Sequence, residues 1–204
     1  LVGRERSKNY NALLKDPFKP LFDRPLMAMY PPGSTFKLVN GLIYQQEGVI
    51  TEDTRFSCSM GYYYSRTRKL GCHPHPNNLD LRESVQHSCN AYYCHGLKGL
   101  LDSPPSGIST TESYNHWRNH VLSMGFGKKL GVDFPNEKGG LILESNRYDR
   151  IYGKNKWKSS TIISIAIGQG EVLATPIQTA NLAALIANRG YFYTPHIIKK
   201  IEGD

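Results

Sequence analysis

The sequence predicts a mostly α-helical fold with few short strands. Apolar residues recur at helical spacing in several segments, and capping residues and glycines mark where those segments begin and end. The 204 residues suffice for one domain. Apolar residues make up 39% of the chain and charged residues 21%, a composition that excludes a disordered chain, a collagen and a coiled coil.

The first part of the chain contains five prolines, Pro17, Pro20, Pro25, Pro31 and Pro32. They predict an irregular lead-in over residues 1–33, because proline interrupts helices. Residues 34–46 place their apolar side chains on one helical face, and Gly48 follows as a stop signal. Residues 49–78 are expected to form a loop.

The next helices have clear boundaries. Asp80 and Glu83 form a capping-box pattern for a helix that breaks near residue 87. Further helices are predicted over residues 90–101 and 112–124.

The last third of the chain begins with residues 131–160, which are rich in turn formers. Thr175 as N-cap and Pro176 at the first helical position begin the last helix, which runs to residue 188. Residues 34–190 are thus the predicted helical region, and residues 191–204 are expected to begin a strand.

The net charge of +8 comes from scattered basic residues, whose longest runs are pairs such as Lys128-Lys129. Nucleic-acid binders concentrate their charge on one face or arm, so no nucleic-acid partner is expected. No apolar run approaches the roughly 18 residues of a membrane span, and no signal peptide is recognised. The chain begins without Met and ends on an apparent strand. We therefore expect it to be a fragment of a longer parent protein.

The sharpest chemical feature is the run Tyr30-Pro31-Pro32-Gly33-Ser34-Thr35-Phe36-Lys37. Ser34 and Lys37 are three residues apart, so both project from one face of the first helical turn. The positive end of the helix favours negative charge near Ser34, and its free N–H groups suit an oxyanion. An apolar environment helps Lys37 to lose its proton and act as a base. The alternative is an ordinary serine cap beside a solvated lysine.

A second feature, Ser88-Cys89-Asn90, lies between two predicted helices. If this link is extended, Ser88 and Asn90 point to one side and Cys89 to the other. A hydroxyl and an amide can relay a proton and hold a substrate amide. The alternative is a helix-to-helix turn in which both side chains cap backbone groups.

Ser34-x-x-Lys37 together with Ser88-x-Asn90 resembles the motifs of penicillin-binding proteins and serine β-lactamases. Longer runs are similar to the class B penicillin-binding proteins of the cell-elongation transpeptidase type, from about Arg6 to Ile201. Those runs are Leu13 to Pro17, Pro20 to Arg24, Tyr30 to Lys37, Ile167 to Gly170 and Ala174 to Gln178.

The resemblance implies a peptidoglycan D,D-transpeptidase that cross-links stem peptides through an acyl-serine and needs no cofactor. Ser34 would attack the penultimate D-Ala, Lys37 would be the general base, Ser88 would pass the proton to the leaving amine, and Asn90 would hold the donor's amide. β-Lactams would acylate Ser34 as inhibitors. The implied partners are a membrane glycosyltransferase and the elongation complex. The implied location is the periplasmic face of the inner membrane, with an anchoring N-terminal helix outside this chain.

One departure from the family is that no Lys-Thr-Gly or Lys-Ser-Gly motif follows Thr175. The resemblance thus implies the helical part of the serine transpeptidase / β-lactamase-like (α+β) fold, lacking most of the central antiparallel sheet. We expect such a fragment to be weakly active or inactive. The alternatives are a serine β-lactamase of the Ser-Thr-Phe-Lys class, which would favour an apolar residue in place of Asn90, and a non-catalytic penicillin sensor or scaffold module.

The cysteines leave two structural interpretations open. Cys58, Cys72, His75 and Cys89 would complete a structural zinc site, since Cys72-x-x-His75 has the spacing of metal ligands, and His73 could replace His75. A Cys58–Cys72 disulfide is the alternative, because the implied periplasmic compartment permits it. Free thiols are the third outcome.

Overall fold

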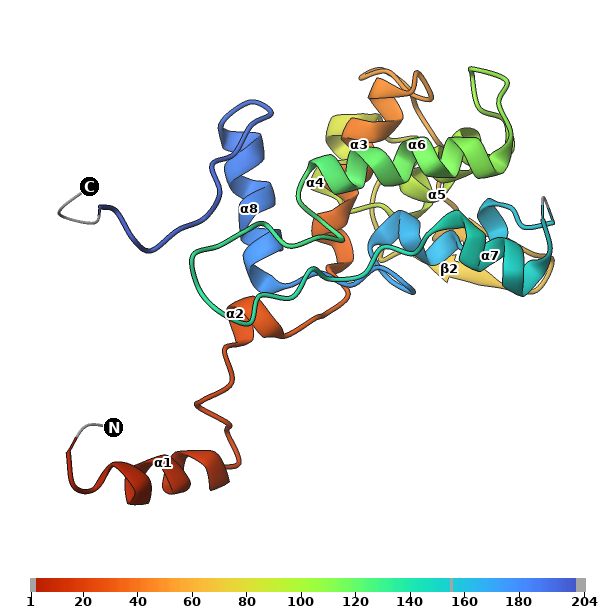
Figure 1. Ribbon diagram of the computed structural model, residues 1–204. Coiled ribbons are helices and arrows are strands. Elements are labelled where there is room, and N and C mark those ends of the chain that lie inside the picture. Colours follow the sequence, from red (N-terminus) through yellow and green to blue (C-terminus); the bar gives the residue numbers. More distant parts are fainter. Residues whose placement is uncertain (1–2, 155, 201–204) are drawn as a thin grey trace.

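The computed structural model describes residues 3–154 and 156–200, and these residues form a predominantly helical body (Figure 1). The predicted fold class is confirmed. The α-helices are α1 (Arg6–Lys15), α2 (Arg24–Met27), α3 (Phe36–Gln46), α4 (Leu81–Gln86), α5 (Asn90–Asp102), α6 (Thr110–Ser123), α7 (Ser145–Tyr152) and α8 (Pro176–Ala187). Short 3₁₀ turns are η1 (Gly33–Thr35), η2 (Ser159–Thr161) and η3 (Ile163–Ile167), and the strands are β1 (Gly61–Tyr63) and β2 (Lys69–Gly71).

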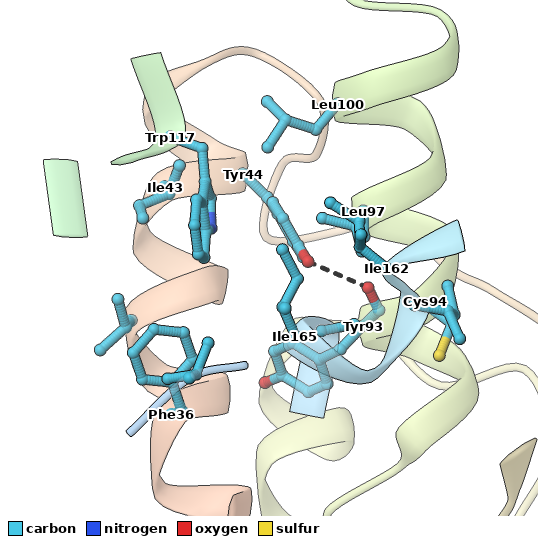
Figure 2. Packing of buried hydrophobic residues seen from close by; sticks show 14 of the residues in the cluster. Phe36, Ile43, Tyr44, Tyr93, Cys94, Leu97, Leu100, Trp117, Ile162 and Ile165 are labelled. Carbon is cyan, nitrogen blue, oxygen red and sulfur yellow. Dashed lines mark hydrogen bonds between the residues drawn. The ribbon is translucent and has the colours of Figure 1, made fainter. Parts of the chain in front are cut away.

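The core is centred on the contact between α3 and α5 (Figure 2). Tyr44 of α3 is fully buried, and its hydroxyl donates to the carbonyl of Tyr93 on α5 at 3.0 Å. The ring can approach because position 96 is glycine, and a Cβ there would collide with it. Trp117 of α6 covers the other side of α3 and meets Phe36 edge-to-face, with 6.3 Å between ring centroids.

Asn40 is the polar centre of this core. The side chain is fully buried on α3, and its Nδ2 donates to the carbonyls of Ile165 and Ala166, each at 3.0 Å. Its Oδ1 accepts the indole N–H of Trp117 at 2.8 Å. Asn40 therefore links α3, η3 and α6 through hydrogen bonds that no apolar residue of similar size could make.

The two strands form an antiparallel hairpin that packs on α5. Their register pairs Gly61 with Gly71, Tyr62 with Leu70 and Tyr63 with Lys69. Tyr62 lies edge-on to His95 of α5, with 4.9 Å between the ring centroids. The hairpin corrects the expectation that residues 49–78 are only a loop, because the tyrosines of β1 favour a strand once one face can pack on a helix.

Three further helices, α1, α2 and α7, were not predicted from the sequence. Residues 1–33 are not all irregular, because α1 precedes the first proline, Pro17, and therefore keeps its backbone donors. Residues 131–160 contain α7, which buries Tyr148 against Trp157 at 5.2 Å between ring centroids. Tertiary packing stabilises α7 where local propensity indicated turns.

The predicted boundaries of the other helices agree with the structure. α4, α6 and α8 all begin with a capping box, formed by Asp80 with Glu83, by Ser109 with Glu112, and by Thr175 with Gln178. α6 starts two residues before the prediction because Ser109 supplies the cap.

The expected strand at the C-terminal end is absent from residues 191–200, and residues 201–204 lie outside the described part. Within that part, the segment has no neighbouring strand to pair with. It is held instead by Asp133, whose carboxylate accepts the N–H groups of Ile197 and Ile198. Among the described residues, no helix combines the length and apolarity that crossing a membrane requires.

We predict that Asn40→Ala lowers the free energy of unfolding by about 2–4 kcal/mol, because it leaves the buried indole N–H of Trp117 and the carbonyl of Ala166 without partners; the carbonyl of Ile165 still accepts the N–H of Gly168. Urea denaturation measures the difference. Asn11→Ala on the exposed α1 is the matched control and should change stability by no more than about 0.5 kcal/mol. Equal stabilities of the two variants would contradict the role given to Asn40.

Candidate active site

Ser34 lies at the surface in the tight turn that leads into α3. Gly33 has a φ of 60°, and its N–H donates to the carbonyl of Gly168 at 2.9 Å. Gly168 also has a left-handed backbone, with a φ of 66°, and a Cβ at this position would collide with the Gly33 carbonyl. Two glycines in contact therefore set the path of the backbone at Ser34.

Lys37 lies one turn further along and is buried, with 3% of its surface exposed. Its Nζ donates to three acceptors: the carbonyl of Ser88 at 2.6 Å, the hydroxyl of Ser88 at 2.9 Å and Oδ1 of Asn90 at 2.6 Å. Burial lowers the pKa of Lys37 below the usual range for lysine. The three acceptors fix the position of the ammonium, and burial prepares it to lose a proton.

The turn between α4 and α5 presents Ser88 and Asn90 to Lys37. Ser88 has a left-handed backbone, with a φ of 49°, and Cys89 is extended as the N-cap of α5. The link is therefore a sharp turn, in contrast to the fully extended link on which the expected orientation depended. Both side chains still point toward Lys37, whereas Cys89 is buried on the other side.

The hydroxyl of Ser88 connects the two residues of the first motif. Ser88 Oγ lies 3.0 Å from Ser34 Oγ and 2.9 Å from Lys37 Nζ. Within residues 3–154 and 156–200, no direct hydrogen bond joins Ser34 Oγ to Lys37 Nζ. The geometry thus gives a relay of two hydrogen bonds through Ser88, where the sequence suggested a direct transfer from serine to lysine.

Asn90 connects this relay to the hairpin. Its Oδ1 accepts from Lys37, and its Nδ2 donates to the carbonyl of Gly71 at the end of β2, at 2.7 Å. An amide nitrogen carries two hydrogens, so one donor remains for a substrate carbonyl.

The four candidate metal ligands also come together. Single ligand atoms of Cys58, Cys72, His75 and Cys89 all lie within 4.8 Å of one another, and the four cysteines of the chain are free thiols. His75 Nδ1 is 2.6 Å from the carbonyl of Pro76, which assigns the proton to Nδ1. Its Nε2 is buried without a hydrogen-bond partner in the described part of the chain. A tetrahedral zinc ion accepts this set of one imidazole nitrogen and three sulfurs, so the residues present fit the metal.

The roles of three residues that support the site were not predicted from the sequence. Asn40 lies one turn beyond Lys37, and a polar residue on an apolar helical face was the available signal. Gly168 and Gly71 act through backbone contacts with Gly33 and Asn90 respectively. Contacts between segments so far apart in the chain leave no local pattern in the sequence.

Comparison with known proteins agrees with this geometry. Residues 2–203 match the penicillin binding protein transpeptidase domain. The chain belongs to this family. It is 30% identical over 203 residues to the peptidoglycan D,D-transpeptidase MrdA of Acinetobacter baumannii, covering 96% of this chain and 28% of that protein. This chain thus spans less than a third of the length of that relative.

Solved structures show the same similarity. The crystal structure of Pseudomonas aeruginosa PBP2 in complex with WCK 5153 matches this chain with a TM-score of 0.79 and 29% identity, over 96% of this chain and 42% of the other. The complex of PBP2 and MreC from Helicobacter pylori matches with a TM-score of 0.74 and 29% identity, over 93% of this chain and 33% of the other. The resemblance to the cell-elongation type of the family is confirmed.

Proposed function

We propose that the complete protein is a peptidoglycan D,D-transpeptidase of the penicillin-binding protein 2 type and that Ser34 is its nucleophile. The observation that supports this is the hydrogen-bonded series from Ser34 Oγ through Ser88 Oγ to Lys37 Nζ. A serine hydroxyl becomes a strong nucleophile when a neighbouring base can take its proton. The relatives are peptidoglycan D,D-transpeptidases, which favours this activity over β-lactam hydrolysis.

Acylation begins when Lys37 is neutral. Ser34 Oγ attacks the carbonyl carbon of the penultimate D-Ala of a stem peptide, and its proton passes through Ser88 Oγ to Lys37 Nζ. The N–H groups at the start of the helical turn stabilise the oxyanion that forms. The proton then returns through Ser88 to the nitrogen of the terminal D-Ala, which leaves as a free amine.

Cross-linking is the reverse of these steps with a different amine. The amine of a second stem peptide attacks the acyl-serine, loses a proton to the relay, and releases Ser34 as the hydroxyl. The free hydrogen of Asn90 Nδ2 holds a carbonyl of the donor peptide during both steps. No cofactor takes part in this sequence of proton transfers.

The relatives support a proposal for the partners and the location. A complex of PBP2 with MreC is known from Helicobacter pylori, so we infer that the complete protein joins an elongation complex that includes a membrane glycosyltransferase. We propose that its active site lies at the periplasmic face of the inner membrane. β-Lactams, which mimic D-Ala-D-Ala, are its expected inhibitors.

We also propose that Cys58, Cys72, His75 and Cys89 hold a structural zinc ion. The buried, unpartnered Nε2 of His75 beside three thiols favours zinc over a Cys58–Cys72 disulfide, which would leave His75 and Cys89 without a function. The four residues would join the loop of residues 58–75 to the back of the turn that presents Ser88 and Asn90.

We predict that Ser34→Ala in the full-length protein abolishes covalent labelling by benzylpenicillin, because the acyl acceptor is gone. Intact-mass measurement and peptide mapping locate the adduct. Ser106→Ala, at an exposed serine, is the control and should be labelled as the wild type is. Labelling of the Ser34→Ala variant at another residue would overturn the assignment, and normal growth and cell shape with this variant alone would favour a scaffold role.

We predict that the rate of acylation rises with pH and that the midpoint of this rise lies below 10.5, the pKa of an ordinary lysine, because burial lowers the pKa of Lys37 and the neutral amine is the base. Stopped-flow measurements with a chromogenic cephalosporin give the profile. Lys37→Arg should lose the rising limb and slow acylation by about 100-fold or more, because a guanidinium keeps its proton. Lys98→Arg, at an exposed lysine, is the control, and a pH-independent wild-type rate would contradict the role of Lys37.

We predict about one zinc ion for each purified chain, detected by mass spectrometry of the metal content. Cys72→Ala should lose the metal and lower the Tm by about 5 °C or more, because metal binding adds to folding stability. Cys94→Ala removes a buried thiol outside the cluster and should keep the metal. A metal-free native chain lighter by two hydrogen atoms would instead indicate the Cys58–Cys72 disulfide.

A further inference from the structure

The hairpin beside Asn90 carries a concentration of unpaired positive charge. Residues 54–79 contain no aspartate or glutamate. Arg66, Arg68 and Lys69 are exposed, and none of them forms an ion pair with any residue that the structure describes. Arg55, in contrast, is neutralised by Asp80 and Glu83 of α4. The charges of the hairpin are therefore available to an external anion.

The hairpin is held firmly by its inner face. Tyr62 packs on His95, and Leu70, its cross-strand partner, packs against the buried core. Its tip is closed by Ser65, whose hydroxyl accepts the N–H of Arg68 at 3.0 Å. The outer face is thus presented by a fixed support, which reduces the entropy lost on binding.

The outer face combines a cation with an aromatic ring. Tyr63 and Lys69 are direct cross-strand partners, and Lys69 Nζ lies 5.3 Å from the centre of the Tyr63 ring. Tyr63 has 61% of its surface exposed, so the ring is open to a ligand. Next to this pair, Gly71 has open space where a side chain would be, which leaves room for another backbone to approach.

The outer face of the hairpin lies next to the active-site residues, to which a series of hydrogen bonds connects it. Ser34 contacts Ser88, Lys37 joins Ser88 to Asn90, and Asn90 donates to the carbonyl of Gly71. Lys69 lies two residues from Gly71 on an extended strand, which corresponds to about 7 Å of backbone. A peptide with its scissile carbonyl at Ser34 and its next amide at Asn90 would pass its preceding residues over Gly71 toward Lys69.

We propose that the outer face of the β1–β2 hairpin binds carboxylates of the donor stem peptide, through Lys69 and the two arginines at the tip. The inference rests on the proposed transpeptidase activity and specifies its substrate: an acidic stem whose carboxylates precede the D-Ala-D-Ala end. Guanidinium groups pair with carboxylates through two parallel hydrogen bonds, and the Tyr63 ring supplies a surface for the peptide between them.

The test uses the full-length protein with Arg66 and Arg68 both changed to Gln. Two soluble pentapeptides ending in D-Ala-D-Ala serve as donors, one with free carboxylates on its second and third residues and one with both amidated. Release of D-Ala measures turnover, and benzylpenicillin acylation measures the state of Ser34. The variant with Lys128→Gln and Lys129→Gln loses the same charge from an exposed loop and is the control.

We expect the arginine variant to lose about five- to tenfold in kcat/KM on the free-acid peptide, mainly through KM, and to turn over the amidated peptide as the wild type does. Its acylation by benzylpenicillin should stay within about twofold of the wild type, and added salt should reduce wild-type turnover of the free acid alone. Equal loss on both peptides, or no loss on either, would overturn the inference. A wild-type protein that benzylpenicillin does not acylate would instead refute the proposed function itself.

Discussion

The buried ammonium of Lys37 is the interaction on which the site depends. An isolated charge in the protein interior is costly, and here three acceptors from the Ser88–Asn90 turn compensate for the lost water. The same contacts define where that turn must lie relative to α3. Folding and the proposed activation of Ser34 therefore depend on the same set of hydrogen bonds.

α3 organises the site through residues one turn apart. Lys37 connects it to the turn before α5, Asn40 connects it to η3 and α6, and Tyr44 connects it to the backbone of α5. At its beginning, the contact between Gly33 and Gly168 sets the approach of the chain to Ser34. Ser34 is thus exposed to solvent, while Lys37, Asn40 and Tyr44 of the helix that follows it are buried.

The sequence predicted the parts of the structure that depend on local rules. The capping-box pattern at Asp80 and the N-cap Thr175 followed by Pro176 located helix starts, and the spacing of Ser34 and Lys37 placed both side chains in one turn. The four candidate metal ligands, which include the Cys72-x-x-His75 pair, also lie close together in the structure. Contacts between distant segments were not predictable in this way. The relay through Ser88, the contact of Asn90 with Gly71 and the packing that stabilises α7 all depend on tertiary structure.

The two tryptophans of the chain have a practical consequence. Trp117 and Trp157 are both buried and both contact the ring of Tyr114, with centroids 5.2 and 5.5 Å away. The indole N–H of Trp117 donates a hydrogen bond to Asn40. The indole ring also contacts Phe36, a residue that lies between Ser34 and Lys37 in the chain. Indole emission shifts with the polarity and hydrogen bonding around the ring. The intrinsic fluorescence of this protein is therefore an optical reporter of α3, the helix that carries Lys37 and Asn40, and it requires no added label.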